Sequence, residues 1–88
     1  MAVNLGIQGQ DASGFWDTQT VVEDVPKGNR GEIIRVSKVI KDRRVYVDVR
    51  NWFIHSGTQV LTPGKGIAIP MDAVDAVLEA AYRAVDAS

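Results

Sequence analysis

Cationic and aromatic side chains alternate with valines along residues 44–53, where the sequence has its clearest chemical pattern. Every second residue of the first part is a valine, at Val45, Val47 and Val49. The residues between and after them are polar or aromatic: Arg44, Tyr46, Asp48, Arg50, Trp52 and Phe53. A period of two over this length predicts a half-buried β-strand with the valines facing inward and the polar side facing outward. Cations interleaved with flat rings on an open sheet suit an unpaired nucleic-acid strand, because they match its phosphates and its bases.

Charge is unevenly distributed along the 88 residues, although the net charge is only −1. Residues 31–66 carry seven basic and three acidic side chains, whereas the segments before and after them are net acidic. One face of the molecule is therefore expected to be positive, which favours a polyanionic partner. On charge alone, an ordinary solvated sheet face is an equally good interpretation.

The sequence lacks the residues that most catalytic and metal sites require. It has no cysteine and a single histidine, His55, which has no metal-ligating neighbour at helix or hairpin spacing. Ser56 adjoins His55, but sequence neighbours on a strand or turn usually point apart. Asp48 is expected to pair with a cation such as Arg35 or Arg50 rather than to act as an acid. We therefore expect no catalytic residue, no metal, no cofactor and no enzymatic activity.

The chain length fits one domain preceded by an extension. Glycines interrupt residues 1–30, which are expected to form a partly flexible N-terminal extension with a candidate extra strand at residues 17–25. The aromatic pair Phe15-Trp16 either docks on the body or waits for a ligand, and docking is favoured because exposed pairs of this kind are uncommon. Residues 31–88 are expected to form the binding domain.

Within that domain, long strands are predicted at residues 32–41 and 44–53, with a hairpin turn at 41–43. Short strands follow at 58–61 and 67–69, and the proline and glycines of residues 62–66 predict a sharp corner that projects Lys65. Strand parity places Trp52 with Arg50 and Phe53 with the valines, so that only a bulge near Asn51 would turn Phe53 outward. The fold class is therefore α+β, a four-stranded curved antiparallel sheet followed by one C-terminal helix (ββββα).

Residues 71–86 are predicted to form that helix, which begins after Pro70. Its charged residues fall in one narrow arc, and the rest of its surface divides into a bulky apolar face and a face of small residues. A helix that covers one sheet needs only one apolar stripe, so the second face predicts a homodimer. The expected interface residues are Ala73, Ala76, Val77, Ala80 and Ala84. The alternative is that alanine is simply a strong helix former that tolerates exposure.

The order of these elements resembles the positive cofactor four family of transcriptional coactivators, which bind single-stranded DNA. The resemblance lies in the strand VDVRNWF at residues 47–53, the segment TPGKGIAI at 62–69, and the closing helix. It implies a ββββα homodimer whose curved sheets bind single strands. It also implies that Arg50 contacts DNA, that a base stacks on Phe53, and that Lys65 is the basic residue before the Gly-Ile pair. Arg44 matches a lysine that opens the second strand in the family. With the remaining cations and rings, the expected DNA-binding residues are Arg35, Lys38, Lys41, Arg43, Arg44, Tyr46, Arg50, Trp52, Phe53 and Lys65.

The chain departs from that family in two places. Lys41 stands in the hairpin where the family commonly has an aromatic residue, so one stacking platform is missing unless Trp52, Tyr46 or the Phe15-Trp16 pair replaces it. The serine- and lysine-rich tail of eukaryotic members is also absent, which suggests a bacterial or phage member. Transcription, replication and recombination all stay open as processes, with replication or transcription proteins as further candidate partners.

Two other functions fit the same residues. The basic face could dock a structural dimer on replication or transcription machinery, or it could bind RNA, because cations and rings do not by themselves distinguish ribose from deoxyribose. No apolar run is long enough to span a membrane, and the N-terminus lacks the basic start and apolar core of a leader. We expect an intracellular location, in cytoplasm or nucleoid, or in the host cytoplasm for a phage protein.

Overall fold

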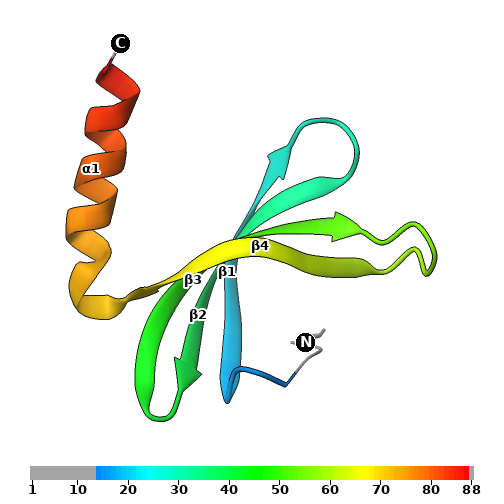
Figure 1. Ribbon diagram of the computed structural model, residues 1–88, viewed down its shortest axis with the longest axis horizontal. Coiled ribbons are helices and arrows are strands. Elements are labelled where there is room, and N and C mark those ends of the chain that lie inside the picture. Colours follow the sequence, from blue (N-terminus) through cyan, green and yellow to red (C-terminus); the bar gives the residue numbers. More distant parts are fainter. Residues whose placement is uncertain (1–13, 88) are drawn as a thin grey trace.

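The computed structural model describes residues 14–87. Four strands come first, β1 (Thr18–Lys27), β2 (Glu32–Lys41), β3 (Arg44–Ile54) and β4 (Leu61–Pro70). A single 3-10 turn, η1 (Met71–Ala73), then leads into the helix α1 (Val74–Asp86). The strands form one antiparallel sheet in the order β1-β2-β3-β4, strongly twisted, with α1 to one side of it (Figure 1). The α+β class and the ββββα order are as the sequence predicted.

The four strands are not the four that the sequence predicted. The candidate extra strand at residues 17–25 is a full member of the sheet, because β1 pairs with β2 along its whole length. The sheet therefore extends across the boundary expected between residues 30 and 31, and residues 1–13 of the expected extension lie outside the described residues. Conversely, the two short strands expected at 58–61 and 67–69 are wrong, since β4 runs unbroken from Leu61 to Pro70.

The corner expected at residues 62–66 is also wrong, for a physical reason visible in the pairing of β4. As the last strand of the sheet, β4 tolerates Pro63, because an edge strand has backbone N–H groups that no neighbour needs. The glycine and lysine that follow Pro63 are accommodated by a β-bulge, in which Gly64 and Lys65 together lie opposite Asn51. Gly66 fits a close approach of two backbones, since a Cβ there would lie 2.5 Å from the Val49 carbonyl oxygen.

The hairpin between β2 and β3 turns on two residues in the left-handed region. Asp42 and Arg43 have φ of 51° and 70°, as a type I′ turn requires at both central positions. The Asp42 N–H donates to Oδ2 of Asp17 at 2.8 Å, and the Asp17 N–H donates to the Ile40 carbonyl at 2.8 Å. The segment before β1 is thereby fastened to this hairpin.

The interior of the sheet is small, and the helix adds little to it. The buried apolar residues are Val39, Trp52 and Ile69, and the buried polar ones are Ser37 and Asp48. No residue of α1 is buried, so the bulky stripe that we expected to lie on the sheet is uncovered within residues 14–87. No helix in this part of the chain is long and apolar enough to cross a membrane.

Candidate nucleic-acid interface

The strand register divides the candidate residues between the two faces of the sheet. Directly opposed residues of antiparallel strands share a face, and Arg35 opposes Arg50 while Ser37 opposes Asp48. One face, called here the polar face, thus contains Arg35, Ser37, Lys41, Arg44, Tyr46, Asp48, Arg50 and Trp52. The other, called the valine face, contains Val36, Lys38, Val45, Val47, Val49 and Phe53. The ten expected DNA-binding residues therefore do not form one continuous surface.

The polar face is more enclosed than the sequence predicted. We expected it to face outward, yet Asp48 is 2% exposed and Trp52 is 5% exposed, whereas the valines opposite are only half-buried. The segment before β1 and the bulged part of β4 both contribute to the walls around it. A hydrophobic alternation identifies two faces of a strand, but it does not reveal which face the rest of the chain covers.

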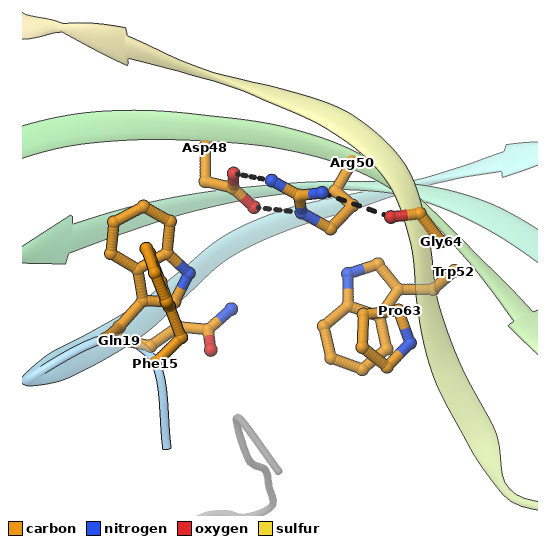
Figure 2. A pocket seen from close by; sticks show the side chains of 8 residues that line it. Phe15, Gln19, Asp48, Arg50, Trp52, Pro63 and Gly64 are labelled. Atoms are coloured by element: carbon orange, nitrogen blue, oxygen red, sulfur yellow. Dashed lines mark hydrogen bonds and ion pairs between the residues drawn. The ribbon is translucent and has the colours of Figure 1, made fainter. Parts of the chain in front are cut away.

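Arg50 is held in place by acceptors of its own chain. Its Nη2 and Nε donate to the two carboxylate oxygens of Asp48 at 2.8 and 3.1 Å, and its Nη1 donates to the Gly64 carbonyl at 3.1 Å (Figure 2). The expected pairing of Asp48 with a cation is confirmed, with Arg50 as the partner. These bonds use three of the five N–H groups of the guanidinium, and the bond to the Gly64 carbonyl ties β3 to the bulge of β4.

Arg35 is also paired inside the chain. Its Nε and Nη2 donate to the two carboxylate oxygens of Asp24 on β1, at 2.8 and 3.0 Å. Its guanidinium carbon lies 4.6 Å from the centre of the Trp52 ring, within the range of a cation–π contact. Arg35 thus covers one side of the indole and bridges β1 to β3.

The remaining candidate cations have no ion pair within residues 14–87. Lys38, Arg43, Arg44 and Lys65 are exposed, and Lys41 is half-buried. Lys41 Nζ lies 5.0 Å from the centre of the Phe15 ring, and the Arg44 guanidinium lies 5.8 Å from that of Tyr46. These five side chains lie along β2, at the β2–β3 hairpin and at the β4 bulge.

An aromatic cluster of Phe15, Trp16 and Tyr46 stands beside the hairpin. Of these three, only Tyr46 was among the expected binding residues, and the other two were a candidate replacement for the missing stacking platform. Phe15 and Trp16 meet edge to face with 4.7 Å between ring centres, and Trp16 lies 6.0 Å from Tyr46. The expectation that the aromatic pair docks on the body of the protein, rather than staying exposed for a ligand, is confirmed for Trp16, which is half-buried. Phe15 is 55% exposed. The presence of two adjacent aromatic residues in the sequence was the signal that this segment docks. That Trp16 docks beside Tyr46 could not be predicted, because the contact depends on the pairing of β1, β2 and β3.

The two neighbouring rings of β3 lie on opposite faces. A bulge does lie opposite Asn51, but its extra residue belongs to β4, and the β2–β3 register continues past Asn51 without a shift. Phe53 therefore keeps the parity of the valines, with its ring 3.3 Å from the position a Gly64 Cβ would occupy. Trp52 lies on the polar face, below Arg35.

A pocket opens on the polar face, with a volume of about 370 Å³. Its walls come from the segment before β1, from β1 itself, from β3 and from the β4 bulge, as Figure 2 shows. The lining residues are Phe15, Trp16, Gln19, Asp48, Arg50, Trp52, Pro63 and Gly64. Within residues 14–87 no group of three or more histidine, cysteine or acidic residues is arranged to hold a metal ion.

Comparison with known proteins identifies the fold. No family model matches the chain, and no curated protein is similar enough in sequence to be matched. Among solved structures, the chain is similar to a PC4 homolog from Burkholderia pseudomallei, with a TM-score of 0.69 and 24% sequence identity over 83% of this chain and 97% of that one. PC4 is positive cofactor four, so the fold that the resemblance implied is confirmed. At this identity the likeness defines the class of fold and leaves the function to be argued from the site.

Proposed function

We propose that this chain binds single-stranded DNA as a homodimer, with little sequence preference, and that it is not an enzyme. The fold shared with a PC4 homolog carries this proposal, because the resemblance to the positive cofactor four family implies a sheet that binds single strands. The polar face supports it with rings and cations around a pocket that a flat base can enter. Phosphate contacts come first from Lys38, Lys41, Arg43, Arg44 and Lys65, which have no ion pair in residues 14–87.

Arg35 and Arg50 take a second role in this proposal, because each already has a carboxylate partner. They hold neighbouring strands of the polar face in position. Each can contact a phosphate only through those guanidinium N–H groups that are not bonded to its carboxylate partner. Tyr46 and Trp52 border the path of the strand on the polar face. Phe53, on the valine face, is reached by a strand that passes over the β4 edge at the bulge.

The homodimer is proposed from the uncovered helix. Leu78, Tyr82 and Val85 are 52%, 76% and 80% exposed, and a second copy that covers them would remove this apolar surface from water. The small residues Ala73, Ala76, Val77, Ala80 and Ala84 let another helix approach closely. The cellular role is the protection or exposure of transient single strands in transcription, replication or recombination, inside a bacterial or phage-infected cell.

The direct test is fluorescence anisotropy of labelled oligothymidine, a matched duplex and single-stranded RNA, each at several salt concentrations, with light scattering for the oligomeric state. A dimer with about four phosphate contacts per sheet should prefer oligothymidine, with a log–log salt slope of about −3. Tight binding only to RNA would favour the RNA-binding alternative. A folded dimer that binds no oligonucleotide would favour docking on a protein.

Arg44→Ala tests the assignment of phosphate contacts. We expect weaker binding and a salt slope reduced in magnitude by about 0.7, the value for one single-strand phosphate contact. Arg83→Ala is the matched control, since it removes the same charge from the outer surface of α1 and should leave the slope unchanged. Equal slopes for Arg44→Ala and the unaltered chain would remove Arg44 from the interface.

A further inference from the structure

The pocket on the polar face has two indole walls, and its two charged side chains are paired with each other. Arg50 donates both to the Asp48 carboxylate and to the Gly64 carbonyl, and the Gln19 Nε2 donates to Ser37 Oγ at 3.3 Å. A phosphate finds no unpaired cation here, because Arg50 is neutralised by the carboxylate beside it. The pocket is therefore unsuited to the backbone of a nucleic acid, although cations surround it.

One buried donor in this pocket has no acceptor. Nε1 of Trp52 is buried without a hydrogen-bond partner among residues 14–87, which is uncommon for a polar atom in a folded protein. In Figure 2 this ring nitrogen lies on the edge of the indole that faces the space toward Gln19. The indole is a donor only, so Trp52 Nε1 lacks a hydrogen-bond acceptor within residues 14–87.

The shape of the pocket narrows the ligand further. A volume of about 370 Å³ is at the lower end of the range of ligand pockets and is sufficient for one flat base. Trp16 provides an aromatic wall from the segment before β1, and that segment is fixed to the β2–β3 hairpin by the Asp17 and Asp42 bonds. Its position is therefore set by the fold before any ligand arrives.

We propose that this pocket receives one unpaired base of the bound strand, a base with an exocyclic carbonyl such as thymine, whose oxygen accepts a hydrogen bond from Trp52 Nε1 while its ring lies against Trp16. This inference rests on the proposed single-strand binding and adds a base subsite to it. Because Nε1 is covered in the unbound chain, a wall must give way. Gln19 is weakly held, since its bond to Ser37, at 3.3 Å, is longer than the usual range.

The test uses the indole N–H groups of the ¹⁵N-labelled full chain. The sequence has two tryptophans, Trp16 and Trp52, so the spectrum has two indole signals, and Trp16→Phe assigns them. We expect the Trp52 signal to move downfield with oligothymidine and to stay in place with an abasic oligomer of equal length, which offers the same phosphates without bases. Oligodeoxyadenosine, whose base has ring-nitrogen acceptors but no exocyclic oxygen, should move it less than oligothymidine does.

The possible results distinguish failure of the base subsite from failure of the proposed single-strand binding. If oligothymidine binds by anisotropy and the Trp52 signal does not move, the base subsite is wrong and single-strand binding stands. If the abasic oligomer or oligodeoxyadenosine moves the signal equally, the carbonyl assignment is wrong. If oligothymidine does not bind at all, both proposals fail together.

Two substitutions give the affinity side of the same test. Trp52→Phe keeps a ring but removes the donor, and should weaken oligothymidine binding about 2- to 10-fold, as one net hydrogen bond predicts, with no change for the abasic oligomer. Trp16→Ala removes a stacking wall and should weaken it about 5- to 150-fold. Thermal melts of both variants check that they fold. An equal loss on the abasic oligomer would contradict the subsite.

Discussion

The chain contains two ion pairs of the same chemistry in opposite surroundings. On the sheet, Asp48 and Arg50 meet at 2.8 Å with side chains 2% and 24% exposed. On α1, Glu79 and Arg83 meet at 3.6 Å with side chains 78% and 70% exposed. The first pair is enclosed by the polar face and shares a carbonyl of β4, whereas the second is surrounded by water. The same contrast holds for the apolar residues, since Val39 is fully buried in the sheet while Tyr82 of α1 is 76% exposed.

This contrast shows that the sheet covers some of its own charged and apolar residues, whereas no residue of α1 is buried by the rest of residues 14–87. Buried charges are costly unless they are paired, so the sheet carries its own compensation for them. Uncovered apolar side chains are costly in water, and nothing in residues 14–87 compensates for those of α1. In the proposed function, the sheet provides a preformed binding surface. The helix provides the apolar surface that a second copy would cover, which would stabilise the protein as a dimer. Substitutions on the two elements should therefore have different consequences.

Arg50→Ala should have the largest effect. It leaves the Asp48 carboxylate buried without its cation, and breaking a buried pair in this way costs about 3–5 kcal/mol. We expect a lower free energy of unfolding in urea, with the loss concentrated in the sheet. Replacing Asp48 by alanine in the same chain removes the stranded charge and should restore most of the stability. A double variant as unstable as the single one would contradict this explanation.

That result also bears on DNA binding. Loss of binding in Arg50→Ala cannot by itself assign a phosphate contact, because the sheet is weakened at the same time. Binding should be compared at a temperature where the variant is folded, with the Asp48→Ala/Arg50→Ala double variant beside it. If the folded double variant keeps the salt slope of the unaltered chain, Arg50 acts by positioning.

Leu78→Asp should have an intermediate effect and should act through the partner. A leucine that becomes covered contributes about 1.5–3 kcal/mol, so a charge there should convert the dimer to monomer in light scattering at micromolar concentration. Glu79→Gln, one residue along on the polar arc, is the matched control and should leave the dimer intact. A Leu78→Asp protein that stays dimeric would place the interface elsewhere on the chain.

The strong features of the fold could be predicted because they leave a local signature. The alternation at residues 44–53 and the long apolar helix each fix an element through its own period. The bounds of the fourth strand could not be predicted from the sequence, because Pro63 and the glycines around Lys65 usually interrupt a strand. Their place at a sheet edge, with a bulge opposite Asn51 and a close backbone approach at Gly66, depends on pairing with β3.

In the candidate site, too, contacts between residues close in sequence could be predicted, and contacts that depend on strand pairing could not. The Asp48–Arg50 pair could be anticipated because residues two apart on a strand share a face. The Asp24–Arg35 pair and the contact between Trp16 and Tyr46 could not, since both depend on β1 being a full strand in a particular register. The enclosure of Trp52, and hence its unpaired N–H, follows from that register and from the β4 bulge together.

Arg83→Ala should have the smallest effect of all. The Glu79–Arg83 pair is spaced i, i+4 on the helix surface with a separation of 3.6 Å, and exposed pairs of this type contribute about 0.3–0.5 kcal/mol. We expect a change of that size in the urea midpoint at low salt, and a smaller one at 1 M salt, where exposed charges are screened within about 3 Å. A loss comparable to that of Arg50→Ala would mean that this pair is enclosed in the assembled protein. The acidic arc of α1, rather than its alanine face, would then lie against the partner.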